Sequence, residues 1–334
     1  MNVEQAAKEA KLAFAKKVRE RLSKQPLTFE ELKEALNCKQ AELKHALQGL
    51  KLSGANLSTL TGNRIYLDPI LQQGGTLELK AEDRGDGWTV VGFVSDNHLG
   101  NKHSRLDVLE AAYDFFAAEG VKHVLNGGNW VDGEARFNRH ELIVAPGMDA
   151  QLNYALEVYP QRKGITTHFI SGDDHEGWWV HRECVNVGEY FQMRAERVGR
   201  HDLRYLGHVE ADIKLRRGNK SVVGRIMHPG GGAAYALSYA PQKLVESFQG
   251  GEKPVLLWIG HYHKYDVCYP REVVCISLGC TTDQSAFLRK NKIGVHVGFG
   301  MTKLMQDKLD GHVTRVQHEW IPFYDRGYYE KRFG

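Results

Sequence analysis

Residues 167–176 read THFISGDDHE, a short apolar run that changes abruptly into charged and polar residues. An apolar run of this length predicts a buried strand, and the glycine and acids that follow predict the end of the strand. The same change occurs in WTVVGFVSDNH (88–98), VKHVLNGGNWVD (121–132), VVGRIMH (222–228) and PVLLWIGHYH (254–263). Helical patterns such as LDVLEAAYDFFAAEG (106–120) separate several of these runs. The sequence therefore predicts an α/β domain with buried sheets.

Each of these runs ends in residues that can bind a metal ion. Loops at the carboxyl ends of strands are where α/β sheets build ligand sites, so we expect these side chains to converge. A two-metal phosphoryl site needs hard oxygen and imidazole ligands, a bridging group, and a proton donor outside the ligand shell. The residues that supply these types are Asp96, His98, Asn129, Asp132, Asp174, His175, His228, His261 and His263.

The order D-x-H, G-N-x-x-D, D-H-E, H and G-H-x-H resembles the signature of the calcineurin-like metallophosphoesterases. The resemblance runs from about Trp88 to Asp266, and each block follows a predicted strand. It implies a four-layer α/β/β/α sandwich, two sheets flanked by helices. The stretches HPGGGAAYALSY (228–239) and GGEKPVLLWIGHYHK (250–264) also resemble a phage and bacterial branch of this family that carries a winged helix in front.

The resemblance implies two divalent metal ions. The first would be bound by Asp96, His98 and His263, and the second by His228 and His261. Shells of imidazole and carboxylate accept Mn²⁺, Fe²⁺, Zn²⁺ or Ni²⁺, and Mn²⁺ is the expected ion because nuclease members of the family usually use it. The attacking group would be a hydroxide that bridges the two ions.

Two further residues are implied to be catalytic. His175 would face the substrate phosphate as proton donor without binding metal, and Asp132 would orient it through its other ring nitrogen.

Two positions depart from the family pattern. Asn129 stands where the bridging aspartate is expected, and Asp174 stands where a neutral asparagine is expected; Asp173 replaces the usual preceding glycine. An amide oxygen is neutral and bridges two cations poorly, but Asp174 restores the number of carboxylates. We therefore predict that Asp174 takes over bridging and that Asn129 is a terminal or weak ligand. The alternative is a decayed site that holds one metal.

Residues 1–79 predict a separate winged-helix (helix-turn-helix) domain. A first helix is expected over about Glu4–Leu22, and Thr28 with Glu31 has the spacing of a capping box that opens a second. A third helix over AELKHALQGLKL (41–52) and a hairpin around residues 61–63 complete the order. KAEDRGDG (80–87) is predicted to be a linker, and residues 88–334 the metallophosphoesterase domain.

The first 70 residues hold 12 Lys/Arg against 8 Asp/Glu, an excess of +4. This charge favours contact with nucleic-acid phosphates, DNA before RNA, although winged helices also serve as protein-contact modules. Lys39, Lys44 and Arg64 of this domain are candidate contacts to phosphates. Near the predicted metal site, the candidate substrate contacts are Arg136, Arg139 and Trp178.

These features predict a metal-dependent phosphodiesterase, a nuclease on DNA or RNA. One alternative is a phosphoesterase acting on a small nucleotide or a phosphoprotein, because the same ligands serve both. Another is a non-catalytic winged-helix protein with a degenerate site.

The remaining expectations concern composition. The five cysteines form no CxxC pair, and no signal peptide or apolar membrane span is present, so a cytoplasmic protein is expected, in host cytoplasm if phage-encoded. No membrane partner is expected, and the oligomeric state stays open, a homodimer included. His181, His201 and His208 lie outside the motif blocks and are expected on the surface.

Overall fold

The computed structural model describes residues 3–22, 25–52, 57–60, 63–67, 75–81, 87–134, 143–232 and 234–323. Contacts divide the chain into two compact units, Met1–Gln72 and Gln73–Gly334, which we call the N-terminal unit and the C-terminal unit. Within the described residues, every helix is too short or too polar to span a lipid bilayer.

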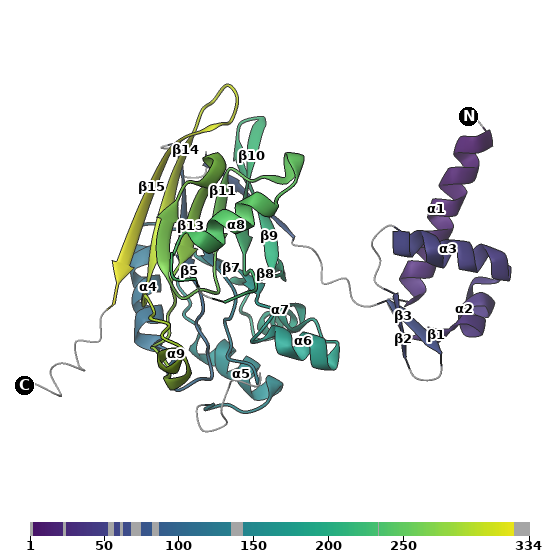
Figure 1. The fold of residues 1–334 in the computed structure, drawn as a ribbon, viewed down its shortest axis with the longest axis horizontal. Helices are drawn as coiled ribbons and strands as arrows, with labels where there is room; N and C mark the ends of the chain where they lie inside the picture. Colours follow the sequence, from purple (N-terminus) through teal and green to yellow (C-terminus); the bar gives the residue numbers. More distant parts are fainter. Residues whose placement is uncertain are drawn as a thin grey trace, which may run out of the picture. The chain divides into compact units, whose positions relative to one another are not determined.

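The N-terminal unit combines helices with a small antiparallel sheet (Figure 1). In chain order its elements are α1 (Val3–Leu22), β1 (Leu27–Thr28), α2 (Phe29–Leu36), α3 (Gln40–Leu52), β2 (Leu57–Leu60) and β3 (Arg64–Leu67). The strand order is β1-β3-β2, and β2 and β3 form the predicted hairpin. A core of Val18, Leu32, Leu43 and Leu50 holds the helices together.

The C-terminal unit contains two six-stranded sheets. The first has the order β15-β14-β5-β6-β7-β8, and the second β12-β13-β11-β10-β9-β4. The strands of the first sheet are β5 (Trp88–Val94), β6 (His123–Asn126), β7 (Thr166–Ser171), β8 (Leu203–His208), β14 (Gly298–Gln306) and β15 (Val313–Pro322). The strands of the second are β4 (Thr76–Lys80), β9 (Glu210–Arg217), β10 (Lys220–Met227), β11 (Leu256–Ile259), β12 (Tyr265–Cys268) and β13 (Val274–Leu278).

All five apolar runs identified in the sequence are strands. Strands β5, β6 and β7 are parallel neighbours in the first sheet, and β10 and β11 are parallel neighbours in the second. In β5 every residue after Trp88 is buried, as expected for a strand that is covered on both faces. The carboxyl ends of these strands carry the predicted ligand residues.

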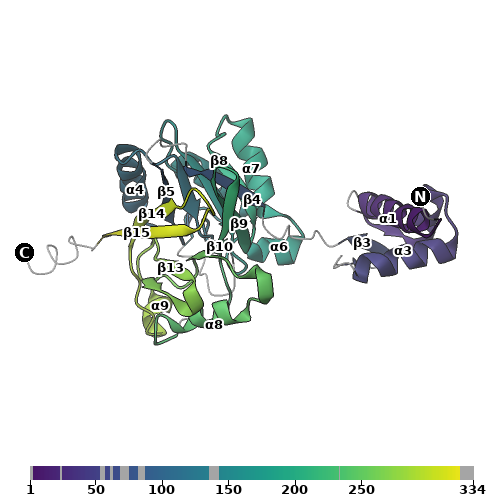
Figure 2. The ribbon, with the colours of Figure 1, turned by 90° about the horizontal axis from the view of Figure 1, so that it is seen from above.

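The two sheets pack face to face, and helices cover their outer faces. Side chains from both sheets, among them Phe93, Ile213 and Trp258, form one core between them. The helices of the unit are α4 (Leu106–Ala118), α5 (Met148–Val158), α6 (Gly177–Glu183), α7 (Val187–Arg197), α8 (Tyr239–Ser247) and the short α9 (Ala286–Lys290). Figure 2 shows α4 and α7 on one side of the strands and α8 on the other, so the order of layers is helix, sheet, sheet, helix.

The boundary between the units lies earlier than the sequence predicted. Strand β4 was expected to belong to the N-terminal domain and to the start of a linker, but it pairs in parallel with β9 from Thr76 to Lys80. Its Leu79 is buried in the core between the two sheets. The alternation of polar and apolar residues in TLELK (76–80) is typical of a half-buried strand, but only the long-range pairing identifies the sheet to which it belongs.

Candidate metal centre

Five of the predicted ligand residues have a left-handed backbone. Their φ angles are 49° at Asp96, 47° at His98, 49° at Asn129, 81° at His261 and 54° at His263. Residues with a Cβ rarely adopt this conformation, and each instance costs free energy that the surrounding structure must offset. Such strain concentrates at functional sites, where a sharp turn directs a side chain towards a fixed point.

The loops after β5 and β6 hold each other in place. The amide of Asp96 donates to the carbonyl of Gly128 at 3.0 Å, and that of His98 donates to the carbonyl of Asn129 at 2.9 Å. The amide of Asp132 donates to the carbonyl of Leu99 at 2.9 Å. These backbone bonds continue the parallel pairing of the strands beyond their ends, and they fix the loops that carry the first ligand blocks.

Asp96, His98 and His263 form the first cluster of the centre. The Nε2 atoms of the two imidazoles lie 3.1 Å apart, and Oδ1 of Asp96 is 3.3 Å from Nε2 of His263. Oδ2 of Asp96 accepts hydrogen bonds from the hydroxyl of Ser95 at 2.6 Å and from the amide of His261 at 3.0 Å. Oδ1 is therefore the carboxylate oxygen that faces the two imidazoles.

Asp174, His228 and His261 form the second cluster. Oδ1 of Asp174 is 3.6 Å from Nε2 of His228, and its Oδ2 is 3.6 Å from Nδ1 of His261. The other ring nitrogens donate to backbone carbonyls, His228 to Gly127 and His261 to Gly231, each at 2.6 Å. These bonds fix each ring so that its remaining nitrogen faces the carboxylate, which is the arrangement seen around metal-ligating histidines.

The buried ligand atoms have the chemistry that a divalent cation requires. Five of them lack a hydrogen-bond partner within the described residues: Asp96 Oδ1, Asn129 Oδ1, Asp174 Oδ1, His228 Nε2 and His261 Nδ1. Buried polar atoms are nearly always paired, and metal coordination pairs them as well as a hydrogen bond does. Carboxylate, amide and imidazole donors suit the late first-row divalent metals and Mn²⁺. The residues present therefore fit one metal ion in each cluster.

The carboxylates and imidazoles of the centre shift each other's pKa values, and a bound cation would take the place of protons on the imidazoles. Burial acts to raise the pKa of Asp174, but the imidazoles of His228, His175 and His261 hold it well below its usual value. Burial opposes charge on His228, yet Asp174 and Asp96 raise its pKa to about 9. In the metal-free protein, protonated imidazole thus balances the carboxylates. Metal binding would displace these protons, because only the neutral ring is a ligand.

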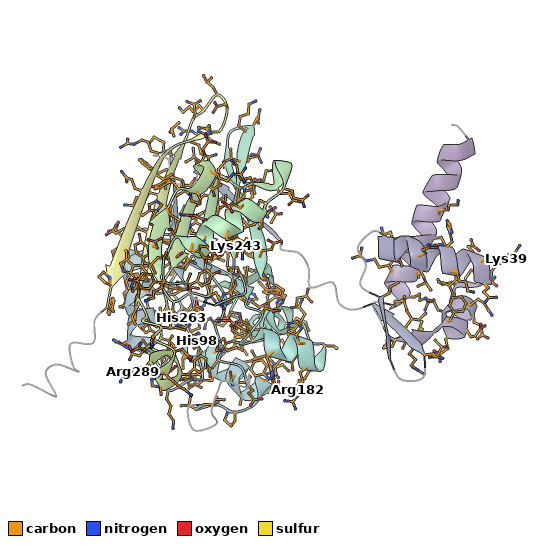
Figure 3. The ribbon with its side chains drawn as sticks, viewed as in Figure 1. Lys39, His98, Arg182, Lys243, His263 and Arg289 are labelled. Carbon is orange, nitrogen blue, oxygen red and sulfur yellow. The ribbon has the colours of Figure 1, made fainter. Side chains whose placement is uncertain are left out.

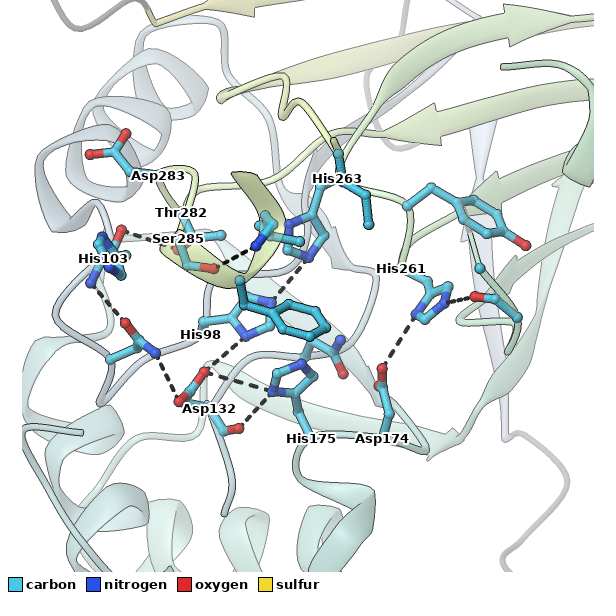
Figure 4. A pocket seen from close by; sticks show the side chains of 18 residues that line it. His98, His103, Asp132, Asp174, His175, His261, His263, Thr282, Asp283 and Ser285 are labelled. Atoms are coloured by element: carbon cyan, nitrogen blue, oxygen red, sulfur yellow. Dashed lines mark hydrogen bonds and ion pairs between the residues drawn. The ribbon is translucent and has the colours of Figure 1, made fainter. Parts of the chain in front are cut away.

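Asp132 orients His98 as well as His175. Its carboxylate accepts from Nδ1 of His98 at 3.2 Å and from the amide nitrogen of Asn101 at 2.9 Å. Nδ1 of His175 donates instead to the backbone carbonyl of Asp132 at 2.6 Å, and it lies 3.7 Å from the carboxylate (Figure 4). The predicted contact between Asp132 and His175 therefore exists, but the backbone oxygen makes the closer bond.

The tautomers of both histidines follow from these bonds. A carbonyl oxygen can only accept, so Nδ1 of His175 carries a proton and Nε2 is on the opposite edge of the ring. Burial, followed by the nearby His175, lowers the pKa of His98 to about 4, so His98 is neutral at pH 7. With Nδ1–H bound to Asp132, its Nε2 presents the lone pair that a metal requires.

Glu176 supports the loops of the centre, and sequence reasoning assigned it no role. It is fully buried, and its Oε1 accepts from the amides of Asn129 at 2.9 Å and Gly172 at 2.7 Å. Burial raises the pKa of Glu176 to about 8. A Cβ added at Gly172 would collide with the side-chain oxygen Oδ1 of Asn129, so a larger residue there would displace this side chain. The available signal was the third acid of GDDHE, at a position that the fold buries.

The clusters lie at the floor of a pocket of about 300 Å³. Figure 3 shows His98 and His263 within the C-terminal unit, and Figure 4 shows His175 and Asp174 below them, at the same pocket. The segment around α9 supplies an apolar wall. Residues of the wall and rim that sequence reasoning did not single out are Asn101, His103, Tyr262, Thr282, Asp283, Phe287, Leu288 and Ile293.

The predicted substrate contacts lie in different places. Arg136 and Arg139 lie outside the described residues. Trp178 lies in α6, where the Arg182 guanidinium covers its ring at 4.6 Å, and it is not among the described residues that line the pocket. In the N-terminal unit the remaining contacts Lys39, Lys44 and Arg64 are exposed.

The histidines outside the motif blocks divide into two groups. His201 is exposed, as expected. His208 was expected on the surface, but it is buried with 6% exposure at the end of β8. His181 is largely exposed, yet its ring bonds to Asp173 at 2.7 Å. The expectation for His208 was wrong because nothing in the local sequence marks the packing of the β7–α6 loop against this strand end.

Comparisons with known proteins identify similar solved structures. No protein-family model matches this sequence, and no curated protein matches it. A novel archaeal phosphodiesterase is similar over 70% of this chain and 99% of its own, with 13% identity and a TM-score of 0.34. Vps29 of Entamoeba histolytica complexed with Zn²⁺ is similar over the same shares, with 16% identity and a TM-score of 0.32. A predicted phosphoesterase of Streptococcus pneumoniae covers 70% of this chain and 98% of its own, with 10% identity and a TM-score of 0.30.

Proposed function

We propose that the C-terminal unit is a metal-dependent phosphoesterase that hydrolyses phosphodiester bonds. The observation that carries the proposal is the pair of clusters, Asp96–His98–His263 and Asp174–His228–His261, whose buried ligand atoms lack hydrogen-bond partners within the described residues. Both clusters meet one pocket, as a site for one phosphate group requires. Two divalent cations bound there would neutralise phosphate charge and lower the pKa of water.

His175 is proposed as the proton donor. Its ring lies at the pocket beside His98, with ring centroids 4.2 Å apart, and its Nδ1 is fixed by the carbonyl of Asp132. In the doubly protonated form, Nε2–H can donate to a phosphate oxygen and then pass its proton to the leaving oxygen. Proton transfer of this kind contributes about 10²–10⁴-fold to a rate.

Asp174 is proposed to replace the usual bridging carboxylate. Asn129 is 1% exposed and its side-chain oxygen has no hydrogen-bond partner within the described residues, which fits a neutral, weak ligand. Asp174 contacts both histidines of the second cluster and supplies the second carboxylate of the centre. The total negative charge available to two cations then equals that of a centre with aspartate at position 129 and asparagine at position 174.

Nucleic acid is the proposed substrate class, and DNA the first candidate. The order of elements in the N-terminal unit, with α3 before the β2–β3 hairpin, is that of a winged helix. Leu43 and Leu50 of α3 are buried while Lys44 is exposed, so this helix presents a basic residue to solvent. A winged helix in the same chain as a phosphodiesterase would bind the duplex, which is an argument by analogy of fold.

A small phosphoester is the second candidate, and a specific observation favours it. Phe287, Leu288 and Ile293 form an apolar wall close to the ligand clusters, and such a wall suits a base or another apolar group on the phosphate. A protein that binds nucleic acid and has a degenerate site is the third candidate. The presence of every predicted histidine ligand and of His175 argues against it.

Cleavage of labelled single- and double-stranded DNA with Mn²⁺ tests the proposal, with His175→Ala as the comparison. The variant should keep its metal content and lose about 10²–10⁴-fold in rate, because His175 is not a ligand. The chain without residues 1–72 should lose DNA cleavage but still hydrolyse a small chromogenic phosphodiester. Hydrolysis of the small diester alone would support the second candidate. DNA binding without any hydrolysis would support the third.

A further inference from the structure

A second group of metal-ligating side chains lies outside the pocket. It consists of Asp173 in the β7–α6 loop, His181 in α6 and His208 at the end of β8, and we call it the outer cluster. None of the three is among the described residues that line the pocket. Asp173 and Asp174 are adjacent, but Asp174 faces His228 and His261, whereas Asp173 faces the outer histidines.

The distances within the outer cluster suit three ligands of one ion. Oδ1 of Asp173 lies 2.7 Å from Nε2 of His181 and 3.2 Å from Nε2 of His208, and all three ligand atoms lie within 4.8 Å of one another. Ligands bound to Zn²⁺ at about 2.0–2.2 Å in tetrahedral geometry lie about 3.3 Å apart. A small outward rotation of the exposed Asp173 and His181 side chains would open the space for the ion.

His208 is oriented as a metal-ligating histidine usually is. Its Nδ1 lies 2.9 Å from the Ser171 hydroxyl, which in turn lies 3.1 Å from the Tyr205 hydroxyl. When Nδ1 donates to Ser171, Nε2 carries the lone pair and faces Asp173. Such hydrogen bonds behind a ligand fix the tautomer and the ring direction.

The exposure of the three side chains differs in a way that suits an exchangeable site. The His208 side chain is 5% exposed, while those of Asp173 and His181 are 55% and 59% exposed. One rigid ligand therefore positions the site, and the other two leave a path for the ion and room for water ligands.

We propose that Asp173, His181 and His208 form an additional binding site for a borderline divalent transition metal such as Zn²⁺ or Co²⁺. Two imidazoles and one carboxylate match these ions and suit Mg²⁺ or Ca²⁺ poorly. An ion bound there would join α6 and the end of β8 to the loop that carries Asp174 and His175. The proposal goes beyond the phosphoesterase function and does not depend on it.

Metal counting after Zn²⁺ loading and removal of excess tests this site, with His181→Ala as the variant and His201→Ala as the matched control. His181 is an exposed helical residue, and His201 is an exposed histidine outside the clusters. We expect His181→Ala to hold one Zn²⁺ per chain fewer than the wild type, and His201→Ala to hold the same number. Should His181→Ala fail to fold, Asp173→Asn preserves the shape of the side chain and should lose the same ion.

A second variant, Asp96→Asn with His263→Ala, distinguishes metal binding by the outer cluster from metal binding by the first cluster of the centre. This variant keeps the second cluster, so it should bind two Co²⁺ ions per chain, and adding His181→Ala should lower the count to one and weaken the visible absorption. That result would hold even if the protein hydrolysed no phosphoester. Equal Zn²⁺ contents for the wild type, His181→Ala and Asp173→Asn, all folded, would overturn the proposal.

Discussion

Asn129 and Asp174 are the two residues whose side-chain types set the charge of the metal centre. An asparagine at one position and an aspartate at the other leave the number of carboxylates unchanged, whereas a random loss would more often reduce it. The structure adds that Glu176 fixes the backbone of Asn129 through a 2.9 Å hydrogen bond. The side chain at position 129 is therefore held in the centre whatever its charge.

At this scale we predict that Asn129→Asp leaves the number of metal ions in the centre at two, because Asp174 already supplies the second carboxylate. Asp174→Asn should lose one ion, since it removes the carboxylate that faces both His228 and His261. The number of metal ions per chain is best measured in the His181→Ala background, because the outer cluster then binds no ion. An increase from one ion to two on Asn129→Asp would disprove the exchange and indicate a decayed site.

Helix α2 illustrates an element that local sequence determines. The amide of Glu31 donates to the Thr28 hydroxyl at 3.2 Å, and the amide of Thr28 donates to the Glu31 carboxylate at 2.8 Å. Both halves of the predicted capping box are thus present, and Asn37 ends the helix with a φ of 46°. These contacts span three residues, which is why the sequence alone was sufficient to predict them.

Removal of this cap should weaken the N-terminal unit only. Thr28→Ala is expected to lower the free energy of unfolding of that unit by about 1 kcal/mol, because an orphan amide of the first turn loses its acceptor. Hydrogen exchange on the full chain measures the effect: amides of α2 should exchange about 5-fold faster, while those of β5 keep their rates. Equal protection of α2 in both proteins would show that the box contributes nothing to stability.

The strands of the C-terminal unit show where local prediction ends. The five apolar runs were predicted because each combines an apolar stretch with a polar end. The other strands of the unit lack this combination and were not predicted; among them, β4 and β15 occupy sheet edges and pair on one side only. β4 alternates exposed Thr76, Glu78 and Lys80 with the inward-facing Leu77 and Leu79, but this pattern does not say which strand it pairs with.

For the whole molecule, metal binding should couple to stability. Any ligand that binds only the folded state raises the free energy of unfolding, by about 2.7 kcal/mol per site at 100 times its Kd. For a unit of this size that corresponds to an increase in Tm of about 5–10 °C. Thermal unfolding with excess Mn²⁺ and with chelator measures the difference.

The control for this measurement is the variant Asp96→Asn with His263→Ala, which removes two ligands of the first cluster. Its Tm should respond to Mn²⁺ by about half as much or less. The same increase in the variant and in the wild type would mean that Mn²⁺ acts elsewhere and would contradict the assignment of the centre.

The sequence by itself determined which residue types follow each buried strand and in what order, because strand, turn and ligand block are neighbours in the chain. That local pattern was enough to predict Asp96, His98, His228, His261 and His263 as one group, and the structure brings them together in two adjacent clusters.

Only the tertiary structure decided which other residues support the clusters. Glu176 contacts Asn129 across 47 positions of the chain, and His208 contacts Asp173 across 35. Such contacts depend on how the sheets pack and on the direction in which each strained loop turns its side chains. No short stretch of sequence encodes that information, because it arises from the packing of segments that are distant in the chain.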